Sequence, residues 1–132
     1  MSEATGKVGN RVNGIDLDAL TNVVQQVGED PAKGIVEFRV KSRWVGQTRT
    51  EASVESFTIG GQKVSRSFKI AADEPVELLG ENAAPNPQEL LMTALNACVL
   101  VGYVAGAAVK GIKLEKVEIE TKGELDLSLI HI

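Results

Sequence analysis

The stretch PNPQELLMTALNACVLVGYVAGAAVK, residues 85–110, decides how the rest of this 132-residue chain folds. Residues 90–109 carry no charge and include the only cysteine, Cys98. A helix of this sequence is apolar on nearly every side, whereas a helix that lies on one small sheet keeps a polar face. The helix must therefore be covered from several directions, by lipid, by a thick domain core or by a partner chain.

Both ends of this stretch carry helix boundary signals. Asn86 can accept a hydrogen bond from an early backbone N–H, Pro87 suits the first helical position, and Glu89 completes a capping box. A lysine and then a glycine follow at the other end, as is typical of a helix C-terminus. We predict one helix over residues 87–109.

Lipid is one possible cover, because a run of roughly 20 apolar residues can span a bilayer. Thr93, Asn96 and two glycines weaken that interpretation, and no lysine or arginine lies just before the run to orient it. The flanking segments also alternate like strands that need a helix to cover them. We therefore expect no membrane partner.

The composition limits the other function classes. The chain is short enough for one domain that gains stability from dimerisation. With 14 basic and 18 acidic residues and a net charge of −4, it does not favour nucleic acid as a partner. A single cysteine excludes an intrachain disulfide and a cysteine metal cluster, and the first residues show no apolar signal region. We expect a cytoplasmic protein without cofactor or metal.

The N-terminal part predicts a tail followed by a short helix. We expect residues 1–15 to form a mobile or loosely docked tail. Asp16 can cap a helix that Gly28 ends, and the helix carries one apolar face made of Leu17, Leu20, Val23, Val24 and Val27. We assign residues 1–33 to this tail and helix, and residues 34–132 to the main domain.

The main domain begins with a predicted three-strand meander. Residues 34–44 alternate as in a half-buried strand, and a turn over residues 46–49 leads to a second strand near residues 50–59. A change of phase predicts a bulge near Glu55. Gly60-Gly61 predicts a tight turn into a third strand over residues 62–72.

Two more strands are predicted after the long helix. Residues 114–121 alternate, with Val117 and Ile119 among the apolar positions, and three leucines within residues 125–129 indicate a fifth strand. A meander followed by a long buried helix predicts an α+β fold. The economical way to bury the helix is to enclose two copies between two sheets, which predicts a homodimer.

The sequence resembles one known family. The run NPQELLMTALNAC, followed by GIKLEKVEIETKGELDL, is similar to the osmotically inducible protein C (OsmC) family, which includes the organic hydroperoxide resistance (Ohr) proteins. The likeness covers roughly residues 34–127, including Trp44-Val45-Gly46 and Arg49. It implies an intertwined homodimer with its long helices between two sheets. For active members it implies thiol-dependent reduction of organic hydroperoxides in oxidative-stress defence, using a peroxidatic cysteine, an arginine, a glutamate and a resolving cysteine.

The resemblance implies a site made of Cys98, Arg49 and Glu89. Cys98 takes the place of the peroxidatic cysteine. This cysteine must be a thiolate to attack a peroxide oxygen, but a free cysteine, with a pKa of about 8.5, is mostly protonated at neutral pH. Arg49 is the best match for the guanidinium that would lower this pKa. The hydroperoxide-resistance proteins carry their glutamate where this chain has Gln88, so Glu89 is rotated by about 100° from that position and fits the helix cap better than the site. Other members of the family carry the glutamate at the later position, which Glu89 occupies here.

A second departure concerns the C-terminus. Family members continue into further strands and a helix that carries the resolving cysteine, but this chain ends in Ser-Leu-Ile-His-Ile without a second cysteine. We expect that the C-terminal portion is truncated or replaced. A sulfenic acid at Cys98 would then need an external thiol reductant. His131 stands alone and offers no metal site.

Three functions remain open at this point. The first is an OsmC-like thiol peroxidase acting on a small hydrophobic hydroperoxide. The second is a non-catalytic dimeric module that binds another small apolar ligand between helices and sheets, because a cysteine in an apolar helix is often only a core residue. The third is a small membrane-associated protein. A basic sheet face for an anionic partner would consist of Arg39, Lys41, Arg43, Lys63 and Lys69, but such alternation usually marks the solvent-exposed side of a strand.

Overall fold

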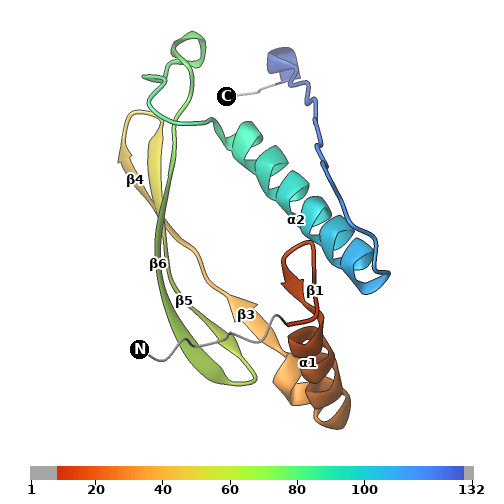
Figure 1. Ribbon diagram of the computed structural model, residues 1–132. Coiled ribbons are helices and arrows are strands. Elements are labelled where there is room, and N and C mark those ends of the chain that lie inside the picture. The colour runs from red at the N-terminus through yellow and green to blue at the C-terminus, as the bar shows by residue number, and fades with distance from the viewer. Residues whose placement is uncertain (1–8, 130–132) are drawn as a thin grey trace, which may run out of the picture.

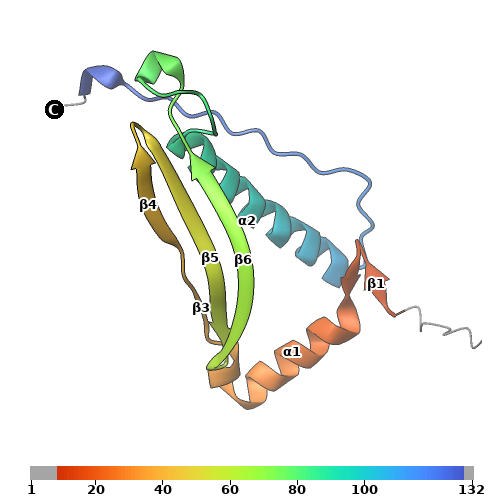
Figure 2. The ribbon, with the colours of Figure 1, turned by 90° about the vertical axis from the view of Figure 1, so that its left-hand side faces the viewer.

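A curved antiparallel sheet and one long helix are the main parts of the molecule, whose computed structural model describes residues 9–129 (Figure 1). The fold is α+β, as predicted. The helix α2 begins beside the end of the sheet and diverges from it toward its own C-terminal end (Figures 1 and 2). The sheet contains β3 (Val36–Phe38), β4 (Lys41–Gly46), β5 (Arg49–Ile59) and β6 (Gln62–Ala72), and α2 spans Pro87–Val109.

The central strand of the sheet is β5. It pairs antiparallel with β6 along one edge and with β4 and then β3 along the other. The pairing of β5 with β6 shifts register between Val54 and Ser56, and the pairing of β5 with its other neighbours changes from β4 to β3 at the same place. This irregularity at Glu55 confirms the predicted bulge. Gly60 and Gly61 connect β5 to β6 with φ angles of +55° and +77°, the left-handed pair that a two-residue hairpin needs.

The strand predicted over residues 34–44 is interrupted, which corrects the sequence-based prediction. The 3₁₀ helix η1 (Pro31–Gly34) occupies its start, and Arg39 and Val40 separate β3 from β4. Phe38 pairs with Phe57 and Lys41 with Ser53. Three β5 residues therefore face two edge-strand residues, so the ladder cannot continue in register.

The predicted N-terminal tail is wrong for residues 9–15. The strands β1 (Arg11–Val12) and β2 (Ile15–Asp16) form a small hairpin, and Asn13-Gly14 turns between them with φ angles of +52° and +78°. Residues 1–8 lie outside the described range. Asp16 caps the following helix α1 (Leu17–Glu29) by accepting a hydrogen bond from the Ala19 N–H at 3.0 Å, and this helix ends one residue after Gly28.

The boundaries of α2 are those predicted. The Asn86 side chain accepts a hydrogen bond from the Glu89 N–H at 2.8 Å, and the Glu89 carboxylate accepts one from the Asn86 N–H at 2.9 Å. Pro87 occupies the first turn, and Gly111 follows the last turn with a φ of +69°. These local contacts fix both ends of the helix whatever covers its sides.

The fourth and fifth strands do not form within this chain, which is a second correction. Between α2 and residue 126 the chain has no strand, and Leu127–Leu129 form a 3₁₀ helix, η3. This C-terminal segment runs back along α2, held by a 2.6 Å hydrogen bond from the Thr121 hydroxyl to Asn96 Oδ1 (Figure 1). A strand needs a neighbouring edge, and a helix offers none, so the alternating residues stay unpaired.

The apolar surface of the chain is largely uncovered. Within residues 9–129, Ala108 is the only buried apolar residue, whereas Leu91 is 72% exposed, Val101 69% and Trp44 72%. The chain exposes 11,037 Å², against roughly 6,700 Å² for a folded monomer of its 14.0 kDa mass. Residues 1–8 and 130–132 account for at most roughly 1,700 Å² of the excess, even at the exposure of an unfolded chain. One chain alone therefore does not enclose its own apolar residues.

Candidate functional site

Cys98 lies in the middle of α2 and is exposed in the single chain. Glu89 precedes it by nine positions, which places the two residues about 13.5 Å apart along the helix axis and roughly half a turn apart around it. The Glu89 carboxylate is also bound within the capping box. The structure therefore does not bring the predicted carboxylate of this chain to its thiol.

Arg49 begins β5, directly after the turn that follows β4. Its Nη1 lies 3.3 Å from Glu81 Oε2, and its side chain is 42% exposed. Its Nε is buried without a hydrogen-bond partner among the described residues. No hydrogen bond or ion pair joins Arg49 to Cys98 within the described part of this chain. Sequence reasoning placed Arg49 at the site but missed its carboxylate partner, Glu81.

Asp73 is the buried carboxylate that organises this region. It is 1% exposed, and its Oδ1 accepts hydrogen bonds from the Thr48 hydroxyl at 2.6 Å and the Glu74 N–H at 2.9 Å. Its Oδ2 accepts hydrogen bonds from the Glu81 N–H at 3.1 Å and the Ala83 N–H at 3.0 Å. The hydrogen bond from Thr48, followed by that from Ala83, holds the pKa of Asp73 below its usual value. Asp73 thus ties the loop before α2 to the turn before β5.

The rest of this loop is folded tightly around Asp73. The Asn82 N–H donates to the Glu74 carbonyl at 3.1 Å, and Gly80 is buried so close to that carbonyl that an added Cβ would clash with its oxygen. Gln47 Nε2 donates to the Leu79 carbonyl at 2.6 Å, which fastens the loop to the β4–β5 turn. These contacts place Glu81 opposite Arg49. The run of acidic residues without a base in this loop was a signal that it needs a cation, although its partner lies more than thirty positions earlier in the sequence.

Replacing Asp73 with Asn is expected to destabilise the protein at neutral pH, because an amide cannot accept all four hydrogen bonds. We expect a drop of roughly 5 °C in Tm at pH 7. Since the folded-state pKa lies below the reference value of 3.8, the carboxylate stabilises the fold fully above that pH, and the benefit is lost as the pH falls through the folded pKa. The difference in Tm between wild type and variant should therefore shrink in acid, as followed by circular dichroism.

The matched control for this prediction is Glu77→Gln, which removes an exposed carboxylate from the same loop. It should leave Tm unchanged at neutral pH. A Tm difference for Asp73→Asn that stays constant into strong acid would show that the carboxylate charge has no part in holding the loop.

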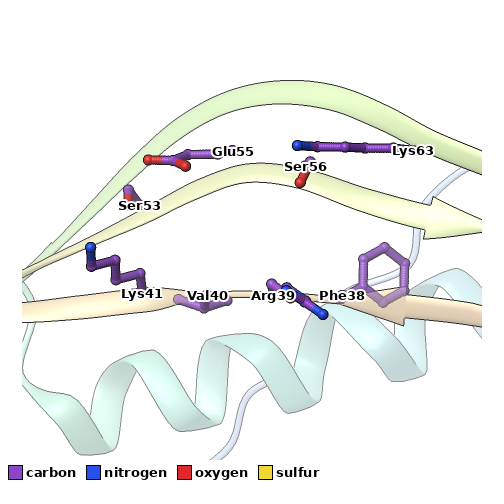
Figure 3. A pocket seen from close by; sticks show the side chains of 8 residues that line it. All are labelled: Phe38, Arg39, Val40, Lys41, Ser53, Glu55, Ser56 and Lys63. Carbon is purple, nitrogen blue, oxygen red and sulfur yellow. The ribbon is translucent and has the colours of Figure 1, made fainter.

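A hollow of about 580 Å³ opens where β3 and β4 separate from β5 (Figure 3). Lys41, Ser53 and Glu55 lie toward one end of it, and Lys63 and Phe38 toward the other. Nearby, Arg39 pairs with Glu37 at 2.6 Å. The hollow contains neither Cys98 nor Arg49, so it is separate from the predicted site.

The neighbouring charges of this sheet face are also mixed. Arg43 Nη2 lies 2.9 Å from Glu51 Oε1, and Lys69 Nζ lies 3.6 Å from the same oxygen. Arg43 and then Lys69 hold the pKa of Glu51 below its usual value. Because two of these basic side chains are paired with Glu51, this face has the mixed charge of a solvent-exposed strand face. Within residues 9–129, no group of three or more His, Cys, Asp or Glu side chains is arranged to hold a metal ion.

The comparisons with known proteins concern the part of the chain that contains Cys98. Residues 80–131 match the family model described as OsmC-like protein. This part of the chain, which we call the OsmC-like segment, is similar to OsmC-like proteins. The OsmC-like segment includes Glu81, α2 with Cys98, and the C-terminal segment, whereas Arg49 precedes it. No curated protein matches the chain. The resemblance found in the sequence is therefore confirmed over the OsmC-like segment.

Proposed function

We propose that the protein is a thiol-dependent peroxidase that reduces small hydrophobic hydroperoxides through Cys98. The observation that carries this proposal is the exposed thiol in the middle of the uncovered apolar helix, inside the OsmC-like segment. Apolar side chains around a thiol favour an organic hydroperoxide over hydrogen peroxide, because burial of its hydrocarbon part contributes to binding. The protein would serve in oxidative-stress defence in the cytoplasm, independently of lipid or nucleic acid.

The active form in this proposal is a homodimer. The single chain exposes at least roughly 2,600 Å² more than a folded monomer of its size, and obligate homodimers bury about 2,000–5,000 Å² or more, counted over both partners. Two copies of α2 packed between two sheets would cover Leu91, Leu95 and Val101, which are all more than half exposed in one chain. The unpaired residues 114–121 would gain a strand edge from the second copy, giving an intertwined assembly.

The dimer also supplies a reason why the site residues are apart in one chain. Arg49 lies at the loop that precedes α2, whereas Cys98 lies midway along the helix. In an intertwined arrangement, the turn before β5 of a second copy can approach the middle of α2. We therefore place the complete site at the interface, with the thiol from one copy and the guanidinium from the other.

The chemistry assigned to the site is a two-electron reduction. The Cys98 thiolate attacks the terminal peroxide oxygen, so that an S–O bond forms while the O–O bond breaks, and the alkoxide leaves and is protonated to the alcohol. The guanidinium of Arg49 would stabilise both the thiolate and the leaving alkoxide. Two equivalents of an external thiol then reduce the sulfenic acid, releasing water and a disulfide of the reductant and regenerating Cys98.

Treatment with one equivalent of cumene hydroperoxide is expected to convert Cys98 to the sulfenic acid. Mass spectrometry should find the mass of one added oxygen, or of a dimedone adduct, on the peptide that contains Cys98. Cumyl alcohol, which lacks the O–O bond, is the matched control and should leave the peptide unchanged. An unmodified Cys98 with unconsumed hydroperoxide would contradict the proposed function.

A binding module without catalysis is the second candidate. A hollow of about 600 Å³ lies between the C-terminal half of α2 and the segment that follows it, and its lining is mainly apolar: Val99, Gly102, Tyr103, Gly106, Ala107, Lys110, Ile112 and Leu114. A small apolar ligand would suit this lining. Such a module would bind cumyl alcohol and cumene hydroperoxide alike and would consume neither.

Lipid is a third possible cover for α2. The helix is long and apolar enough to cross a membrane by length and composition alone, and a core helix can pass the same test. The dimer proposal predicts that the protein stays in solution without detergent. Recovery of the protein only in the membrane fraction, or only with detergent, would favour lipid instead.

A further inference from the structure

The carboxylate that accompanies Arg49 comes from the loop before α2 and not from the helix. Glu81 Oε2 lies 3.3 Å from Arg49 Nη1, whereas the Glu89 carboxylate is bound to the backbone N–H of Asn86. We propose that Glu81 is the positioning residue for Arg49 in the peroxidase site, and that Asp73 holds the two in place. This inference rests on the proposed function of Cys98.

The buried side chain of Asp73 holds the backbone next to both members of the Arg49–Glu81 pair. The two oxygens of Asp73 accept hydrogen bonds from the Thr48 hydroxyl and from the Glu81 backbone N–H. Thr48 directly precedes Arg49 in the sequence. Hydrogen bonds to Asp73 therefore hold the backbone on both sides of the pair, next to Arg49 and at Glu81. Asp73 is 1% exposed and has little freedom to move.

The pair leaves most of the guanidinium free for another anion. A guanidinium has five N–H donors, and the contact with Glu81 occupies one end of it. The Nε is buried and has no hydrogen-bond partner among the described residues, so the donors open to an external anion are those of the two terminal nitrogens. With 42% of the side chain exposed, the remaining donors can face a thiolate or a peroxide.

Stability alone is a poor explanation for this ion pair. The Glu81 side chain is 50% exposed, and ion pairs between exposed side chains contribute little to the free energy of unfolding. The pair can instead fix the orientation of the Arg49 guanidinium. A guanidinium that rotates away from the thiol no longer stabilises the thiolate. We therefore expect Glu81 to affect the reactivity of Cys98 and to leave the stability of the fold nearly unchanged.

The test compares Glu81→Gln, Glu81→Asp and Arg49→Ala in the full-length protein. The second-order rate constant for oxidation of Cys98 by cumene hydroperoxide should fall about tenfold in Glu81→Gln, and about a hundredfold in Arg49→Ala, as is usual for loss of an electrostatic group. Glu81→Asp keeps a carboxylate and should recover part of the rate. Alkylation of Cys98 by iodoacetamide, followed over roughly pH 5 to 9, should need a higher pH in both slow variants, while Tm stays constant.

Glu77→Gln is the control, because it removes an exposed carboxylate of the same loop, whereas the ion pair of Arg49 is with Glu81. It should match the wild type in rate and in alkylation profile. A loss of rate in Arg49→Ala with no change in Glu81→Gln would overturn this inference and leave the proposed function standing. A wild-type Cys98 that reacts with hydroperoxide no faster than a cysteine peptide would overturn both.

Discussion

Replacing Cys98 with Ser should reduce hydroperoxide consumption to the rate of the uncatalysed mixture. Serine keeps the size and position of the side chain, but its hydroxyl is not ionised at neutral pH and does not attack a peroxide oxygen. Loss of a nucleophile typically costs an enzyme more than on the order of 10³-fold in rate. The measurement is the disappearance of cumene hydroperoxide in the presence of a dithiol, with ferrous iron and xylenol orange as the indicator.

The same experiment separates the two leading functions. Because Cys98 is the single cysteine of the chain, no other thiol can replace it. The Ser variant should keep its Tm and its mass in solution, so that the loss of rate is not a loss of fold. Equal rates for the wild type and the variant would remove catalysis by Cys98 and leave the binding module as the better account.

Replacing Val101 with Glu should break the assembly of the protein. Val101 is 69% exposed in the single chain, and an exposed helix position of that kind normally tolerates a charge within about 0.5 kcal/mol. In a symmetric dimer the substitution buries a carboxylate twice, at an effective cost of several kcal/mol per ion. A loss of about 4 kcal/mol weakens association on the order of 10³-fold. Sedimentation and circular dichroism should therefore show dissociation together with loss of structure.

Val76→Glu is the matched control for this substitution. Val76 is 64% exposed, so its exposure in the single chain is close to that of Val101, but it lies in the 3₁₀ helix η2 (Val76–Leu78), in the loop before α2. The control variant should keep the mass and the circular dichroism of the wild type. If both variants behave like the wild type, α2 has no partner and the interface proposed for it does not exist.

Local signals were sufficient to predict the two α-helices and the Gly60-Gly61 turn of this chain. Asn86, Pro87 and Glu89 fix the start of α2 through contacts within one helical turn, so its boundaries could be predicted without knowledge of the rest. The Gly60-Gly61 turn depends only on its own φ angles. The helix α1 was predicted to within one residue because Asp16 caps it. Each of these features is decided by residues close together in the sequence.

Apart from the β1–β2 hairpin, whose Asn13-Gly14 turn is a local signal, the errors concern contacts between distant parts of the chain. The break at Arg39 and Val40 follows from the register of a strand that begins ten residues later, which no local pattern reveals. Residues 114–121 carry the alternation of a strand, but a strand forms only where an edge is available. The alternation therefore indicates that this segment can form a strand, but it does not indicate which strand would pair with it.

The candidate site also combines residues that the sequence indicates with a contact between distant residues that it does not. Cys98 and Arg49 could be chosen from the sequence because the resemblance to OsmC-like proteins indicates them. The pairing of Arg49 with Glu81 depends on how Asp73 folds the intervening loop, and Asp73 itself gave no signal beyond an acidic run. Glu89 was correctly expected to serve the helix cap, because the capping box is a local motif.

The measurement that tests the account most directly is the mass of the wild-type protein in solution. One chain leaves α2 uncovered, so a second copy has to enclose it. Sedimentation equilibrium without detergent should give about 28 kDa, twice the 14.0 kDa of one chain. A monomer of 14.0 kDa that unfolds cooperatively would contradict the account, because it would show that a single chain can bury its own apolar helix.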